Sequence, residues 1–195
     1  MARRIPAVIR LALGALLLNG ILPAMSSGRE TPVAAAWVHR THTLHYVGFY
    51  SQYSCDWLEE KLRMLLKASG ARRDMAITTS CIVVGRPSPD ATARIEFYSL
   101  APIDLAGGAP ETDAAVARAE WRPVVLRDHS PLALEAADCE LVEQFRDQLL
   151  PLFTTRAMAN KTHCRPGENA PGDLNLQFEV LAAQAAPIPE RRAAR

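Results

Sequence analysis

Three histidines near the start of the chain are the clearest group of side chains that could do chemistry. His39, His42 and His45 follow one another at intervals of three residues, and neutral imidazole is the commonest protein ligand for zinc and copper. This spacing is awkward for a strand, in which alternate residues share a face, so a metal site requires a loop that gathers the rings. The alternative is an exposed polar segment before the first strand. No other metal or cofactor site is predicted.

Acidic residues recur at matched positions of two predicted helices, Asp56 with Glu140 and Glu59 with Glu143. Paired carboxylates can do acid–base chemistry. Acidic side chains in the first turns of a helix also complement its dipole, and we favour this interpretation. The sequence has no nucleophile elbow, zinc-protease helix or phosphate-binding loop. We therefore predict no catalytic residue.

The elements that would position these residues occur twice along the chain. Cys55 and Cys139 are 84 residues apart, as are Trp37 and Trp121. Two later matches have offsets of 83 and 81, namely residues 79–81 (Thr-Ser-Cys) with 162–164 (Thr-His-Cys), and residues 97–100 with 178–181. A period this long is not that of a solenoid. We interpret it as one domain made by duplication, the alternative being chance matching of common residues.

Each predicted unit contains a strand, a helix and two further strands, which indicates an α+β fold. Helix 55–68 follows Ser54, a suitable cap, and its apolar stripe places Lys61 and Lys67 on the solvent-exposed face. Asp138 is predicted to cap helix 139–150. The simplest arrangement is a mostly antiparallel sheet with both helices on one face. The strands are predicted at residues 44–51, 75–84, 93–100, 121–127, within 154–164, and 174–181.

Residues 1–26 have the pattern of a secretory signal peptide, with a basic start, an apolar run and small residues before the cleavage point; the alternative is an uncleaved anchor. We divide the remainder into a flexible lead (27–36), a first unit (37–100), a linker (101–119), a second unit (120–181) and a disordered tail (182–195). No second stretch is long and apolar enough to span a membrane, so no membrane contact is expected after cleavage.

The charge of the mature chain bears on its partners. Residues 1–26 hold three of the 22 Lys and Arg and none of the 21 Asp and Glu, so 19 basic and 21 acidic side chains remain. A nearly neutral chain without a basic stripe is a poor candidate for binding nucleic acid. The sequence does not otherwise indicate a partner.

The four cysteines of an exported chain predict two disulfides. Three connectivities are open, and the duplication favours Cys55 with Cys81 and Cys139 with Cys164, so that each unit carries the same bridge. Each bridge would join the first turn of a helix to the strand that follows. The alternative, two pairs of free thiols with redox or metal roles, lacks support because the sequence contains no C-x-x-C motif.

Residues 53–59 (Tyr-Ser-Cys-Asp-Trp-Leu-Glu) and 138–153 resemble segments of uncharacterised exported proteins of Gram-negative bacteria. The resemblance covers about residues 37–181 and implies export without implying any activity. Our leading hypothesis is a periplasmic or secreted binding or structural module with no catalysis. The alternatives are a metal-binding protein that uses the three histidines, and a periplasmic enzyme of unknown class.

Overall fold

The computed structural model describes residues 31–49, 51–81, 86–103, 116–131, 133–164 and 173–184. Strand, helix, strand, strand is the element order in each half of the chain, which confirms the predicted α+β class. The first half contains β1 (Val33–Val47), α1 (Cys55–Ala68), β2 (Ala76–Cys81) and β3 (Asp90–Pro102). The second contains β4 (Val116–Arg127), α2 (Cys139–Gln148), β5 (Thr155–Asn160) and β6 (Asn175–Ala183). The short 3-10 helices η3 (Ala136–Asp138) and η4 (Leu150–Leu152) flank α2.

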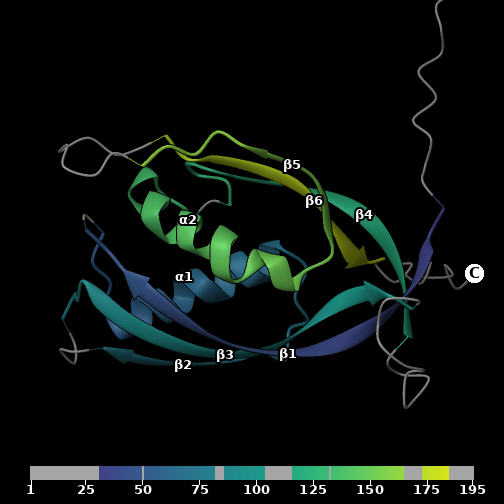
Figure 1. Ribbon diagram of the computed structural model, residues 1–195, viewed down its shortest axis with the longest axis horizontal. Coiled ribbons are helices and arrows are strands. Elements are labelled where there is room, and N and C mark those ends of the chain that lie inside the picture. The colour runs from purple at the N-terminus through teal and green to yellow at the C-terminus, as the bar shows by residue number, and fades with distance from the viewer. Residues whose placement is uncertain are drawn as a thin grey trace, which may run out of the picture.

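The strands form one antiparallel sheet of six strands in the order β2-β3-β1-β4-β6-β5. The ladder at the centre of the sheet, between β1 and β4, is the shortest. β1 pairs with β3 from Ala35 to Val47, but with β4 only from Val33 to Ala36. Beyond this short ladder β1 and β4 diverge, so the sheet opens into a first arm (β2-β3-β1) and a second arm (β4-β6-β5), as Figure 1 shows.

Both helices lie between the two arms (Figure 1). They cover the same inner face of the bent sheet, and one continuous hydrophobic core joins side chains of both arms and both helices. The aromatic rings of Phe97 in β3 and Phe153 after α2 stack across this core with centroids 5.1 Å apart. The two halves therefore share one core rather than having a core each.

Local sequence signals account for α1. The Ser54 hydroxyl accepts a hydrogen bond from the Trp57 amide at 3.4 Å, which satisfies one of the donors left over at a helix start. The leucines at the helical spacing, Leu58, Leu62, Leu65 and Leu66, are fully buried. Gly70 has a φ of +88°, a backbone conformation that glycine adopts without cost and that ends the helix.

The strand registers follow the offsets found in the sequence. Trp37 pairs with Leu100 in the first arm and Trp121 with Leu181 in the second, in agreement with offsets of 84 and 81. In the central ladder, Ala34 pairs with Arg118. These two residues are themselves 84 apart, so an offset of 84 exchanges the two neighbouring pairs, 33 with 119 and 35 with 117.

Several strand ends extend further than the hydrophobic patterns predicted, although β1 ends at Val47 rather than at residue 51. β1 begins at Val33, inside the predicted flexible lead, and β3 and β4 enter the predicted linker from both sides, to Pro102 and from Val116. β6 continues to Ala183, inside the predicted tail. These segments are rich in alanine, which carries little strand propensity, and their pairing with neighbouring strands sets their conformation. The predicted signal peptide, the remainder of the lead before residue 31 and the tail after residue 184 lie outside the described residues.

Both predicted disulfides are present. Cys55 joins Cys81 and Cys139 joins Cys164, with Cα atoms 5.9 Å and 5.6 Å apart. Each bridge fastens the first turn of a helix to an edge strand or to the residues that follow it. The edge strand β5 is also bulged between Arg156 and Ala159, a feature that hinders edge-to-edge association.

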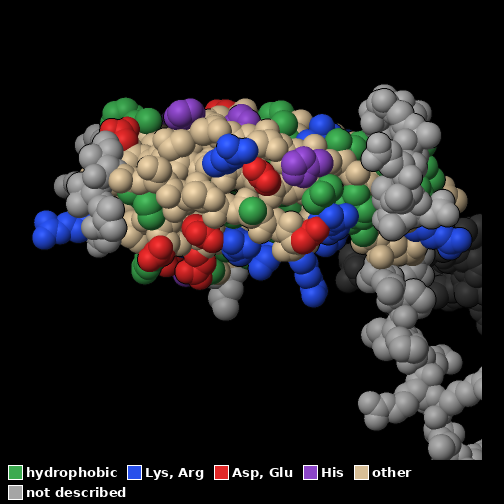
Figure 2. All heavy atoms as spheres, turned by 90° about the horizontal axis from the view of Figure 1, so that it is seen from below, with side chains coloured by type: hydrophobic (Ala, Val, Ile, Leu, Met, Phe, Trp, Pro, Cys, Tyr) green, Lys and Arg blue, Asp and Glu red, His purple; other side chains and the backbone are tan. Residues whose placement is uncertain are grey.

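The outer face of the first arm is polar and largely uncharged. Figure 2 shows this face mostly in tan, the colour of the backbone and of side chains that are neither hydrophobic nor charged, with smaller areas of charged and apolar side chains. The outward residues of β1 and its neighbours include Thr41, Thr43, Thr78, Ser80 and Thr92, all exposed or half-buried. This face is therefore solvated, in contrast to the inner face that the helices cover.

Candidate functional site

The three histidines of β1 do not come together. His39 and His45 are exposed on the outer face, whereas His42 is half-buried and its Nε2 atom is enclosed without a hydrogen-bond partner among the described residues. Continuous pairing of this segment with β3 keeps it extended, and residues three apart on a strand point to opposite faces. Within the described residues no group of three His, Cys, Asp or Glu side chains is arranged to hold a metal ion. The loop that a metal site required does not form.

The matched acidic residues of the helices have different roles. Glu59 forms an ion pair with Arg63, one turn later in α1, at 2.7 Å. The Glu140 carboxylate accepts hydrogen bonds from the amides of Phe49 and Ser51 at 3.1 Å and 3.2 Å. Asp56 is exposed. The structure therefore uses these residues separately, at a helix surface and at a strand end.

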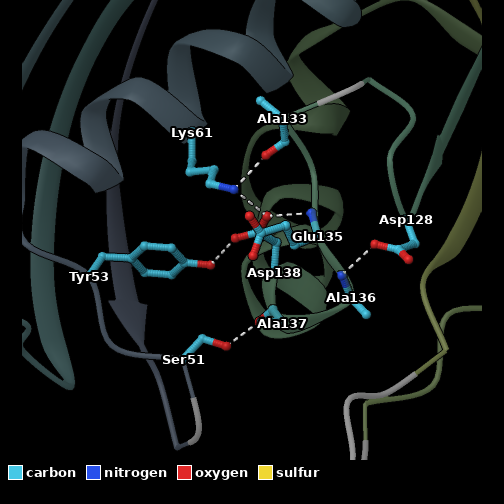
Figure 3. A network of polar contacts seen from close by, with 9 residues as sticks. All are labelled: Ser51, Tyr53, Lys61, Asp128, Ala133, Glu135, Ala136, Ala137 and Asp138. Atoms are coloured by element: carbon cyan, nitrogen blue, oxygen red, sulfur yellow. Dashed lines mark hydrogen bonds and ion pairs between the residues drawn. The ribbon is translucent and has the colours of Figure 1, made fainter.

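Asp138 is the centre of the main buried polar network, shown in Figure 3. Its carboxylate accepts a hydrogen bond from the Tyr53 hydroxyl at 2.5 Å and from the Glu135 amide at 2.8 Å, and it forms an ion pair with Lys61 at 2.6 Å. The Lys61 ammonium also donates to the Ala133 carbonyl at 2.5 Å. The side chains of Lys61 and Asp138 are only 12% and 4% exposed. The network ties α1 and the loop before it to the start of α2.

Two sequence predictions fail at this network. Lys61 does not face solvent, and the Asp138 side chain does not cap α2 because its oxygens bond elsewhere. On a helical wheel Lys61 lies only about 40° from Leu65, at the border of the apolar stripe, since successive residues turn by about 100°. This position on the helical wheel is the sequence feature that could have indicated burial of Lys61. The partners on the other half of the chain could not be found from it.

Tyr46 and Tyr53, which precede α1, lie next to this network. Burial, together with the neighbouring Asp138 carboxylate, raises the pKa of Tyr53 far above its usual value. Burial also raises the pKa of Tyr46, with a further contribution from Glu140. The rings meet edge to face with centroids 5.2 Å apart. Both phenols therefore stay protonated at neutral pH, and Tyr53 acts as a hydrogen-bond donor to Asp138.

α2 closes the edge of β1 that β4 leaves unpaired. The Gln144 side chain accepts from the Val47 amide at 3.0 Å and donates to the Val47 carbonyl at 2.8 Å. Gln148 makes the same two contacts with His45 at 3.2 Å and 3.3 Å. With Glu140 on Phe49, three side chains spaced four residues apart contact three alternate residues at the end of β1 and just beyond it. The stripe satisfies backbone groups that an edge strand would otherwise expose.

A small cleft lies beside the Asp138 network, between α1 and residues 133–135. Its volume is about 210 Å³. Four residues of one α1 stripe, at successive helical spacings, line one wall, and the opposite wall comes from the segment before η3. The lining residues are Trp57, Glu60, Lys61, Met64, Ala133 and Glu135. Trp57 is 63% exposed, so its indole stands at the mouth of this cleft.

Each of the other two tryptophan rings lies near an arginine guanidinium group. The Arg156 guanidinium lies 4.3 Å from the centre of the Trp121 ring. The Arg72 guanidinium lies 5.7 Å from the Trp37 ring and stacks more closely on Tyr98, at 3.7 Å. Asp74 pairs with Arg72 through two bonds of 2.6 Å, and Glu179 pairs with Arg156 at 2.5 Å. The hydrogen bond to Arg72 holds the pKa of Asp74 below its usual value. A tryptophan, an arginine and a carboxylate thus form a recurring set on both arms.

Comparison with known proteins finds no protein family, no curated protein and no solved structure that this chain matches. Among the described residues, neither helix has the length and apolar character needed to cross a bilayer. The geometry alone therefore supports the functional proposal.

Proposed function

We propose that this chain is an exported binding module that is stabilised by two disulfides and does no chemistry itself. The Asp138 network carries this proposal. Its carboxylate is 4% exposed, and the three groups that contact it, the Tyr53 hydroxyl, the Glu135 amide and the Lys61 ammonium, all belong to the fold. A general acid or base must reach a substrate proton. Here the strongest convergence of titratable groups instead joins two halves of the chain.

The disulfides support the proposed compartment. Cys55–Cys81 and Cys139–Cys164 use all four cysteines of the chain, and such bridges persist in the periplasm or outside the cell rather than in the cytosol. Export through the segment 1–26 provides that environment. The exposed indole of Trp57 supports the binding role, because a large aromatic side chain at the mouth of a cleft is a common feature of recognition sites.

Expression, purification and assay of the full chain test the export, the disulfides and the absence of catalysis. In a Gram-negative host, the protein should appear in the periplasmic fraction without residues 1–26, and thiol titration of the denatured protein should find no free thiols. The purified protein should leave a panel of ester, peptide, glycoside and phosphate substrates unchanged. Cytoplasmic protein with reduced cysteines would contradict export, and turnover that follows the protein through purification would contradict a non-catalytic role.

We also propose that the two halves descend from one duplicated segment of strand, helix, strand and strand. Four observations support it: the palindromic strand order, the registers that follow the sequence offsets, the matched disulfides and the matched Trp–Arg pairs. The arginines of these pairs extend the match already found for the two tryptophans. Arg72 and Arg156 are 84 residues apart, as are Trp37 and Trp121. The symmetry axis passes through the pair Ala34–Arg118.

A circular permutant tests this symmetry. Pro102 and Val116 pair with Ala35 and Ala36 on opposite sides of β1, and Ala183 and Val33 pair with Ala119 on opposite sides of β4. Both pairs of ends are therefore roughly 10 Å apart, two strand spacings. We expect that moving residues 104–115 to join residue 184 to residue 31 leaves the near-UV circular dichroism and the disulfide map unchanged. Scrambled disulfides or an unfolded permutant would count against equivalent halves.

A further inference from the structure

We propose that the cleft beside α1 binds an arginine side chain presented by a partner peptide or protein. This proposal rests on the binding role proposed above and adds its site and ligand class. Trp57, Glu60 and Met64 form the α1 side of the cleft, and Glu135 faces them from the segment before η3. An indole face and a thioether suit the flat, weakly hydrated guanidinium group, and two carboxylates suit its charge.

The protein itself shows how it holds arginine. Of the three tryptophans in the chain, Trp121 has the Arg156 guanidinium 4.3 Å from its ring centre. Trp37 lies 5.7 Å from the Arg72 guanidinium, which also stacks on Tyr98 at 3.7 Å. A carboxylate pairs with each of these arginines. Trp57 is the third. It has carboxylates beside it in the cleft, but none of the cation–π contacts among the described residues involves it. The Trp57 cleft therefore has two parts of the recurring set and lacks the arginine.

Charge favours a cationic guest despite the lysine in the cleft. The Lys61 ammonium is bound to Asp138 at 2.6 Å, so its charge is compensated inside the fold. The carboxylates of Glu60 and Glu135 remain at the rim. Glu135 accepts one hydrogen bond from the Asp138 amide, and a carboxylate can accept several. Neither acid forms an ion pair among the described residues, so the rim carries a net negative charge.

The small volume of the cleft suits one side chain rather than a whole metabolite. Clefts that bury drug-sized ligands measure about 300–1,000 Å³, whereas this one measures about 210 Å³. A site for one side chain on the exposed flank of a helix binds weakly by itself. It contributes to recognition as one contact in the interface with a larger partner.

The test is a titration of the full chain without residues 1–26, with its disulfides intact. The probes are three blocked pentapeptides, Gly-Ser-Xaa-Ser-Gly, with arginine, lysine or citrulline at the centre. The indole N–H resonance of Trp57, assigned from Trp57→Phe, reports binding by NMR. We expect the arginine peptide to shift this resonance with a Kd on the order of 1 mM at low salt. Lysine should bind more weakly, and uncharged citrulline at least about tenfold more weakly.

Matched variants locate the site. Trp57→Ala should weaken binding of the arginine peptide about fivefold or more, and the double variant Glu60→Gln, Glu135→Gln should weaken it and remove its salt dependence. Phe49→Ala is the control, because Phe49 is 76% exposed but does not line the cleft. In the Trp57→Ala protein, the amide resonances of Glu60 and Met64 replace the indole as the readout. Trp57→Phe and the glutamine variants keep the test valid if Trp57→Ala does not fold.

Three results would overturn the proposal: no shift at about 20 mM peptide, equal binding of citrulline, or unchanged binding to Trp57→Ala. A fourth concerns the chain's own tail. If replacing Arg191, Arg192 and Arg195 by glutamine tightens peptide binding severalfold, the occupant is this tail rather than a partner. None of these outcomes changes the export and turnover assays, so failure of this site is distinguishable from failure of the proposed function.

Discussion

Replacing Lys61 by methionine is the sharpest test of the network that joins the two halves of the chain. Methionine keeps an unbranched apolar side chain in place of the alkyl part of lysine and removes the ammonium group. The Asp138 carboxylate, 4% exposed, then keeps its bonds from Tyr53 and Glu135 but loses its countercharge. Removing one partner of a buried ion pair costs roughly 3–5 kcal/mol, whereas an exposed pair contributes about 0–1 kcal/mol. Because two hydrogen bonds remain, we expect a loss of about 3 kcal/mol.

The measurement is urea unfolding at pH 7 with both disulfides intact, followed by circular dichroism. Asp138→Asn should cost less, about 2 kcal/mol, since the lysine can extend toward the cleft and regain water. The double variant should cost less than the sum of the two, with a coupling of at least about 1 kcal/mol. Lys67→Met in the last turn of the same helix is the control. Lys67 is exposed, so its replacement should cost no more than about 0.5 kcal/mol.

The reasoning would be refuted if Lys61→Met cost less than about 1 kcal/mol, or if the two single variants were additive. Either result would mean that the pair behaves as an exposed one. An unchanged m-value is expected throughout, because these substitutions do not alter the surface that unfolding exposes. A changed m-value would instead indicate that the two halves unfold separately.

Further predictions concern pH, a close contact and a disulfide. The pKa of Tyr53 in the folded protein lies above its unfolded value of about 10. The contribution of Tyr53 to stability is therefore complete below pH 10, and above it falls by up to about 1.4 kcal/mol per pH unit. Tyr53→Phe should flatten the decline of the urea midpoint between pH 10 and 11.5. Gly48→Ala should lower the melting temperature, because the added Cβ would lie 2.0 Å from the Ser51 carbonyl oxygen. Overpacking of this kind costs roughly 1–3 kcal/mol of stability. An unchanged melting temperature would contradict this close approach. Replacing both Cys139 and Cys164 by serine should cost roughly 3 kcal/mol in the chain-entropy account, measured by urea unfolding; a loss below about 1 kcal/mol would mean that the bridge adds little constraint.

The helices and disulfides were the most predictable parts of the fold because their signals are local or repeated. The predicted bounds of α1 agree with the observed Cys55–Ala68, since a serine cap, a leucine stripe and a glycine stop all fall within one segment. The disulfide pairing followed from the repeat alone. The bent sheet was not predictable, because the ladder at Val33–Ala36 is made by small residues whose pattern differs little from a flexible lead.

The site was harder to predict because its residues come from both halves of the chain rather than from one segment. Lys61 and Asp138 come from different halves, and their counterparts at an offset of 84, Phe145 and Ser54, form no such pair. A repeat in sequence reveals what both halves share. It is silent about the positions at which the two halves differ, and the network occupies such positions.

The bend of the sheet follows from the polar stripe on α2. Four helical residues advance about 6.0 Å along the axis and two strand residues about 6.6 Å, so a helix can match a strand edge for a few residues before the mismatch grows. The central contacts, Gln144 with Val47, are the shortest at 2.8 Å and 3.0 Å, and those of Gln148 lengthen to 3.2 Å and 3.3 Å. Since α2 occupies the edge of β1 that β4 would otherwise extend along, the two arms separate. The separation accommodates α1 as well, and places the exposed stripe of α1 that contains Trp57 opposite residues 133–135.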